Sequence, residues 1–145
     1  MKIVVSWDSS QVLNALGKLR KPDSATARAL QAGALVVERH AKTNIEKHGL
    51  HKTGALVNSI IVKESTPTYA LVGSVGIIYA AVHEFGATIY PKRAKMLSWI
   101  GEDGERIFAK RVRIPARPYL RPALDENIEE IKNVIAQVVI AELLK

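Results

Sequence analysis

The dipeptide His83-Glu84 is the first place where residue types suggest catalytic or metal chemistry. A zinc-binding helix of the His-Glu-x-x-His type needs a second histidine at the position that Ala87 occupies. The other histidines, His40, His48 and His51, lie upstream and favour solvent-exposed or helix-capping roles. No P-loop, Gly-x-Ser-x-Gly or Gly-x-Gly-x-x-Gly motif occurs. We therefore predict no catalytic residue, no metal ligand and no cofactor.

Nucleic-acid binding is a second chemical possibility, because cations and aromatic rings are interleaved through residues 90–121. Aromatic rings can stack on bases while cations follow the phosphates. In the competing interpretation, which we favour, Trp99 and Phe108 fill the core and the cations face solvent or an acidic neighbour. The aromatic residues are Tyr90, Trp99, Phe108 and Tyr119, and the cations are Lys92, Arg93, Lys95, Lys110, Arg111, Arg113, Arg117 and Arg121.

The composition is that of a globular protein, with 145 residues, 48% hydrophobic and 24% charged. The absence of cysteine excludes disulfides, thiol catalysis and cysteine-ligated zinc. No apolar run approaches the roughly 20 residues that span a bilayer, and the N-terminus does not resemble a signal peptide. We therefore expect a soluble protein without a membrane partner, located in the cytoplasm where it is made.

The net charge of +7 is unevenly distributed along the chain. Residues 92–121 carry nine basic and three acidic residues, a net +6, whereas residues 122–145 carry two and five, a net −3. This distribution permits nucleic-acid binding, and it equally permits contact between the basic segment of one copy and the acidic segment of the next. Because an exposed ion pair contributes only about 0–1 kcal/mol, charge would set the register and apolar area would supply affinity.

Hydrophobic periodicity predicts a long helix over residues 24–47, ending at Gly49, and a final helix over residues 119–144. The final helix would begin in a proline-containing first turn, with acidic residues near its positive N-terminal end. Residues 2–7 predict a strand, and residues 12–19 a short helix. The predicted buried stripes are Ala27, Leu30, Ala34, Val37, Ala41 and Ile45 in the long helix and Leu124, Ile128, Ile131, Ile135 and Val138 in the last.

Between these helices, residues 59–114 predict one twisted antiparallel sheet. Strands at 60–62 and 69–75 are expected to form a hairpin. Residues 106–114 alternate in polarity after a polar glycine turn and are interpreted as one strand. The segment 78–85 fits either a short helix or a buried strand.

The predicted fold class is α+β, with an antiparallel β-sheet packed by a long helix from the N-terminal half and by a C-terminal helix. We expect a single domain over residues 1–145. Within it, residues 1–22 would form an N-terminal strand and short helix, and residues 23–145 the main core. The change of period from 3.6 to 2 and back supports this order of elements.

Three motifs occur in order along the chain. They are Thr53-Gly54-x-Leu56-x-x-Ser59-Ile60, then Tyr79-Ala80-x-x-His83-Glu84-Phe85-Gly86, then Pro115-Ala116-Arg117-Pro118-Tyr119-Leu120. They resemble the TG-x-L-x-x-SI, YA-x-x-x-E-x-G and PARPFL motifs of the tail-component and virion morphogenesis proteins of tailed bacteriophages and prophages. The resemblance covers about residues 25–140, and Tyr119 replaces the family's usual phenylalanine.

The resemblance implies a structural, non-enzymatic virion protein that acts in tail completion or head–tail joining. Such proteins work through protein–protein contacts in a ring, often of six copies, with head-neck and tail proteins as partners. The implied location is the neck or tail of the virion, and the host cytoplasm during assembly. A basic nucleic-acid-binding domain is the alternative, with DNA contact secondary in the first interpretation, and a small hydrolase ranks third.

The second and third motifs also predict a specific ion pair. Pro115 and Pro118 fix two φ angles around Arg117, so that its guanidinium is aimed with little loss of entropy. We predict that Glu84 is its partner. If the pair is buried, removing one member would cost about 3–5 kcal/mol. Gly54 and Gly86 are expected at turns, which a Cβ would obstruct if φ is positive there.

Overall fold

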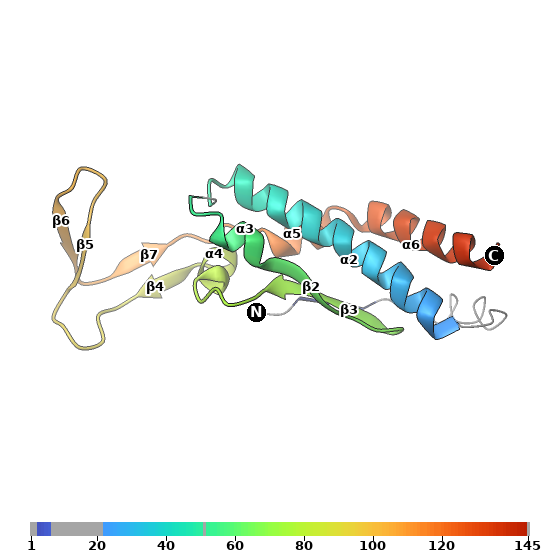
Figure 1. The fold of residues 1–145 in the computed structure, drawn as a ribbon. Helices are drawn as coiled ribbons and strands as arrows, with labels where there is room; N and C mark the ends of the chain where they lie inside the picture. The colour runs from blue at the N-terminus through green and yellow to red at the C-terminus, as the bar shows by residue number, and fades with distance from the viewer. Residues whose placement is uncertain (1–2, 7–21, 51, 145) are drawn as a thin grey trace. The chain divides into compact units, whose positions relative to one another are not determined.

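The computed structural model describes residues 3–6, 22–50 and 52–144 (Figure 1). Contacts between residues divide the chain into two compact units. The first unit is Met1–Ile77 with Tyr119–Lys145, and the second unit is Ile78–Pro118. The helix predicted at residues 12–19 lies outside the described residues, as does His51. That the two units form one domain over residues 1–145 stays a prediction.

Helix α2, Pro22–Lys47, is the longest described element of the first unit and confirms the helix predicted over residues 24–47. Its buried side chains recur every three or four residues, which is the spacing of one helical face. The chain leaves the helix at Gly49, as predicted, where the N–H of Leu50 still donates to the carbonyl of Ile45. The buried positions include Leu30, Ala34, Val37, Ala41 and Ile45.

An antiparallel sheet of three strands, in the order β1-β3-β2, packs beside α2 (Figure 1). Its pairing confirms the predicted N-terminal strand and the predicted hairpin. The central strand is buried along four consecutive residues, so both of its faces are covered. The Glu38 carboxylate on α2 accepts a hydrogen bond from the Val62 N–H at 3.0 Å, which fixes the sheet to the helix. The strands are β1, Ile3–Ser6; β2, Ile60–Ser65; and β3, Tyr69–Ser74.

The second unit contains two separate two-stranded ribbons, so the prediction of one sheet over residues 59–114 is wrong. Strand β4 pairs with β7, and β5 pairs with β6. The segment 78–85, for which the sequence left two possibilities, forms the short helix α4. The bounds are α4, Ala80–Phe85; β4, Ala87–Ile89; β5, Leu97–Ile100; β6, Arg106–Ala109; and β7, Val112–Ile114.

The stretch 106–114 is divided because its two halves have different partners. The β5–β6 ladder runs only as far as the pair Leu97–Ala109. Upstream of Leu97 the chain forms a series of bends after Pro91, which has no N–H to offer a ladder. The strand therefore breaks at Lys110, and the following residues pair with β4 instead. Alternating polarity alone contains no information about this change of partner.

The helix predicted over residues 119–144 is also divided, at Asn127. The backbone φ of this residue is −119°, outside the helical range. Its side-chain amide donates to the carbonyl of Ala123 at 3.0 Å, a local alternative to the helical pattern. The break leaves Ile128 42% exposed, so its predicted place in the buried stripe is wrong. The two parts are α5, Leu120–Asp125, and α6, Ile128–Leu143, with Ile131, Ile135 and Val139 buried.

Helices α2 and α6 pack closely, and a glycine permits their approach. A Cβ atom on Gly33 would lie 2.9 Å from the side chain of Ile135 and 3.2 Å from that of Ile131. Polar contacts flank this crossing. The Arg28 guanidinium donates to the Glu142 carboxylate at 2.7 Å. The crossing thus combines close apolar packing with an ion pair near the end of α6.

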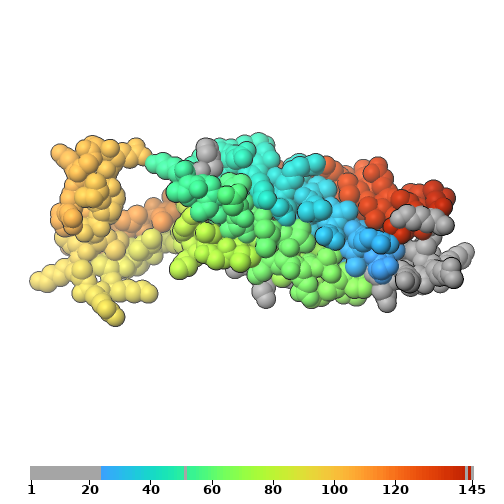
Figure 2. Space-filling model, viewed as in Figure 1, coloured from blue at the N-terminus to red at the C-terminus, as the bar shows by residue number. Residues whose placement is uncertain are grey.

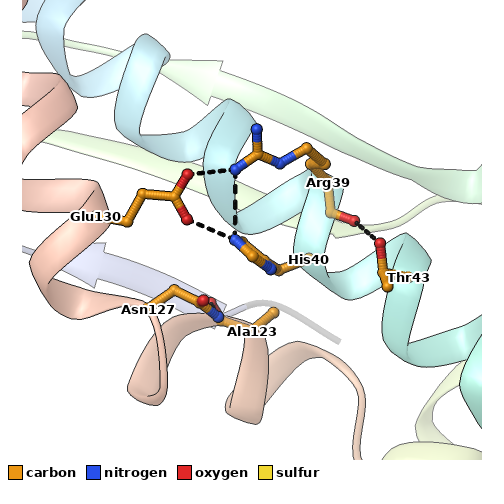
Figure 3. Close-up of polar contacts among 6 residues, drawn as sticks. All are labelled: Arg39, His40, Thr43, Ala123, Asn127 and Glu130. Atoms are coloured by element: carbon orange, nitrogen blue, oxygen red, sulfur yellow. Dashed lines mark hydrogen bonds and ion pairs between the residues drawn. The ribbon is translucent and has the colours of Figure 1, made fainter.

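A second polar cluster joins the same two helices at Glu130 (Figure 3). One carboxylate oxygen accepts from Arg39, and the other lies 2.7 Å from Nε2 of His40. These bonds hold the pKa of Glu130 below its ordinary value, the bond to His40 first and the bond to Arg39 second. The carboxylate is therefore more stable ionised in the folded chain than in the unfolded one.

Stability is expected to fall as the pH falls below about 4.5, the ordinary pKa of a glutamate. A depressed pKa means that the unfolded chain binds a proton more readily, so the contribution of Glu130 is present at neutral pH and lost in acid. Urea unfolding of wild type and Glu130→Gln tests this. The two should differ at pH 7 and converge near pH 3. Glu46→Gln, at an exposed position on α2, is the control, and a gap that stays constant with pH would contradict the prediction.

Candidate protein-interaction surface

The first motif is a structural element of the first unit. Gly54 has a φ of +68° and precedes a short helix, α3, Ala55–Ser59, which the sequence reasoning did not identify. Leu56 is 1% exposed and packs in the core. The Ser59 hydroxyl donates to the Leu56 carbonyl at 2.7 Å and lies 2.8 Å from the Ser74 hydroxyl on β3. The Thr53 hydroxyl accepts the N–H of Ala55 at 3.4 Å. This motif turns the chain into the sheet.

The second motif forms α4 and the turn after it. Glu84 is 3% exposed, while Tyr79 and Phe85 are largely exposed. The rings of Tyr79 and His83 meet edge to face, with centroids 5.7 Å apart. The Nδ1 atom of His83 is buried and has no hydrogen-bond partner among the described residues. Burial lowers the pKa of His83 below its ordinary value near 6.5, and the charge of Arg117 lowers it further.

The third motif returns to the second one through the backbone. The Arg117 N–H donates to the His83 carbonyl at 2.7 Å. Gly86 has a φ of +73°, and a Cβ there would lie 2.9 Å from the backbone nitrogen of Ala116. A side chain at Gly86 would therefore be strained both by its own conformation and by this contact. The second and third motifs therefore meet through a backbone hydrogen bond, and the ion pair between Glu84 and Arg117 stays a prediction.

Most of the predicted basic face lies in the second unit and is exposed. Arg121 is the exception, because it lies on α5 in the first unit and contacts Asp125 at 3.4 Å. Tyr119 also belongs to the first unit and is fully buried, with its carbonyl accepting from Asn44 at 3.1 Å. The exposed cations of the second unit are Lys92, Arg93, Lys95, Arg106, Lys110, Arg111, Arg113 and Arg117.

The aromatic residues of the hairpin are exposed, so the prediction that Trp99 and Phe108 fill the core is wrong. Trp99 is 40% exposed and Phe108 is 58% exposed. Strands β5 and β6 pair only with each other, and a two-stranded ribbon has no second layer of its own to cover its faces. In Figure 2, the gold atoms of the hairpin lie at the surface of the second unit. Large apolar side chains thus stand beside exposed cations on the second unit.

Two pockets lie along the β4–β7 ribbon. One, of about 310 Å³, is lined by Thr88, Tyr90, Arg111 and Arg113. The other, of about 300 Å³, shares Thr88 and Arg113 with it.

Among the described residues, no group of three or more His, Cys, Asp or Glu side chains could hold a metal ion. No helix in the described parts of the chain is long and apolar enough to cross a membrane.

We propose that Arg117 and Glu84 form the ion pair that the sequence predicts. Glu84 is buried, and a buried carboxylate requires a partner. The N–H of Arg117 donates to the carbonyl of His83, the residue before Glu84. The charge of Arg117 also lowers the pKa of His83. These two observations place the guanidinium close to the segment that carries the carboxylate.

Glu84→Gln and Arg117→Ala are each expected to lower the free energy of unfolding by about 1–3 kcal/mol, the range for a lost charge-assisted hydrogen bond. The double variant should cost less than the sum, because residues that form one pair are coupled. Urea unfolding of all four proteins gives this coupling. Arg93→Ala, at an exposed cation of the same unit, is the control and should have little effect.

The titration of His83 gives an independent readout of the position of the Arg117 charge. Arg117→Ala should raise the pKa of His83 towards its ordinary value, since one of the two causes of its depression is removed. NMR titration of the imidazole measures this shift. Additive energies in the double variant, together with an unchanged His83 titration, would contradict the pairing.

A family model described as the phage virion morphogenesis family matches residues 10–140. Searches of curated proteins and of solved structures found no match. The matched region contains all three motifs, and it confirms the resemblance on which their interpretation was based. Because the match extends over most of the sequence, this chain belongs to the phage virion morphogenesis family.

Proposed function

We propose that this chain is a structural virion protein that acts in tail completion or head–tail joining through protein–protein contacts in a homo-oligomeric ring. Membership of a virion morphogenesis family supports a structural role over an enzymatic one. The observation that carries the proposal is the exposed apolar surface of the β5–β6 hairpin. In assembled form the protein would lie in the neck or tail of the virion, with head and tail proteins as its partners.

The register of the hairpin places apolar side chains on both of its faces. Trp99 is paired with Ile107, and Ser98 with Phe108. Directly opposed residues share a face, and neighbouring pairs alternate between faces. Trp99 and Ile107 therefore lie on one face, and Phe108 on the other, each at least 40% exposed. Exposed aromatic residues bordered by cations are typical of surfaces that bind other proteins.

Removal of the gene from an inducible prophage tests this function. Lysates should contain separate heads and tails, or tails of irregular length, when examined by electron microscopy. Supply of the wild-type chain should restore infectious particles, and supply of a Trp99→Ala/Phe108→Ala variant should not. Leu144→Ala, at a position 83% exposed in the first unit, is the matched control and should restore them. Intact infectious particles without the gene would reject the proposal.

Binding to nucleic acid is the second candidate, and the exposure of Tyr90, Trp99 and Phe108 among cations favours it. We nevertheless expect only non-specific affinity for duplex DNA, no tighter than about micromolar at physiological salt. Fluorescence anisotropy across a salt series measures both the affinity and the number of phosphate contacts, at about one logarithmic unit of slope per contact. A tighter, strongly salt-dependent affinity would favour DNA as the principal partner.

A further inference from the structure

The second unit carries opposite charges at two separate places. The turn between β5 and β6, residues 101–105, is acidic and exposed, and we call it the acidic turn. The pocket lined by Thr88, Tyr90, Arg111 and Arg113 is basic, and we call it the arginine pocket. Sequence reasoning identified the turn but gave it no role, and it did not identify Thr88. Each copy of the chain therefore carries an acidic projection and a basic recess.

The acidic turn is held in one conformation by its own hydrogen bonds. The Gly101 N–H donates to the Glu105 carbonyl at 2.7 Å, and the Gly104 N–H donates to the Gly101 carbonyl at 3.1 Å. Asp103 Oδ1 accepts the N–H of Glu105 at 3.2 Å. Neither Asp103 nor Glu105 forms an ion pair with any cation in the described parts of the chain. Their negative charges are therefore available to an external cation.

The arginine pocket is built around the start of strand β7. Arg113 is paired with Thr88 across the β4–β7 ribbon, and Arg111 lies two residues before it. Both arginine side chains line the same pocket. Both arginines are exposed, and neither forms an ion pair with a carboxylate among the described residues. The pocket thus combines two guanidinium groups with a threonine and a tyrosine in its lining.

We propose that the acidic turn of one copy docks in the arginine pocket of the next copy. This inference rests on the proposed ring and names one contact within it. In this contact the carboxylates of Asp103 and Glu105 meet the guanidinium groups of Arg111 and Arg113. Guanidinium groups bind carboxylates in bidentate geometry, which gives the contact direction as well as attraction.

A second copy suits this pocket because the same unit supplies both halves of the contact. The turn and the pocket are different surfaces, so the contact is heterologous. Each docked copy then leaves one turn and one pocket available for further copies. Such contacts close into a ring when the rotation between copies divides the circle. Docking also brings the exposed apolar residues of the hairpin beside the neighbouring copy, where burial can supply affinity that charge pairs do not.

Charge exchange between two variants tests the contact. The turn variant is Asp103→Asn/Glu105→Lys, which keeps the Oδ1 atom that accepts the backbone N–H of position 105. The pocket variant is Arg111→Gln/Arg113→Glu. Each should weaken self-association by about tenfold or more in sedimentation velocity at low salt, the loss expected from one broken charge contact. An equimolar mixture should regain it, because the cation that Glu105→Lys introduces on one chain meets the acidic pocket of the other.

Disulfide capture locates the same contact directly, since the chain has no cysteine of its own. Mixed under oxidising conditions, Asp103→Cys and Arg113→Cys chains should form a covalent heterodimer. A mixture of Asp103→Cys with Lys63→Cys, on strand β2, should not. The charge control is Lys47→Glu/Lys63→Glu, two exposed lysines of the first unit, which should associate like wild type.

Several results would overturn the inference. The first is a wild-type chain that remains monomeric at high concentration. The second is an equimolar mixture of the turn and pocket variants that does not regain self-association. The third is weakened self-association in the pocket variant but not in the turn variant. The last result would assign the pocket to a different acidic segment of the neighbouring copy. Failure of the docking is distinguishable from failure of the proposed function, because the prophage experiment is scored by infectious particles. If deletion of the gene abolishes infectivity but the charge-exchange variants associate like wild type, the proposed function stands and only this contact is rejected.

Discussion

The first unit depends on the close packing of α2 against two neighbours. Its buried positions are small or branched, and Val37, Ala41 and Ile45 are completely buried. Gly33 leaves room for Ile131 and Ile135 of α6, at distances that no Cβ would tolerate without displacement. Alanine there would gain helix propensity of about 0.5–1 kcal/mol, against an overpacking cost of about 1–3 kcal/mol. Packing, rather than local propensity, therefore explains a glycine in the interior of this helix.

Elements with an uninterrupted period and one set of partners could be predicted from the sequence. The long helix α2 is of this kind. The β2–β3 hairpin was predicted from two β-rich runs joined by a short connection, although its ladder contains a register shift between Val62 and Glu64. Errors occurred where a local feature interrupts a good pattern, as Asn127 does in the final helix and the bends after Pro91 do in the ribbons. The burial of Trp99 was predicted because aromatic residues are usually covered, and the sequence does not show that a ribbon lacks a second layer.

The candidate surfaces were predictable to different degrees for a similar reason. Motif residues were recognised by type and spacing, and the meeting of the second and third motifs followed from that recognition. The arginine pocket could not be derived, because Thr88 and Arg113 become neighbours only through the register of β4 with β7. Likewise, the buried Nδ1 of His83, which has no hydrogen-bond partner among the described residues, could not be predicted, because its burial depends on how the chain packs around α4.

The bond from the Arg117 N–H to the His83 carbonyl also has an evolutionary consequence. It ties together the two ends of the segment that forms the ribbons, so the base of that segment is closed independently of its contents. Closing a flexible loop costs only about 0.6 kcal/mol more for each doubling of its length. Insertions, deletions and wholesale exchange between residues 87 and 114 are therefore cheap for the fold. A change of length in this segment would alter the exposed surface of the second unit and leave the packing of α2 in the first unit intact.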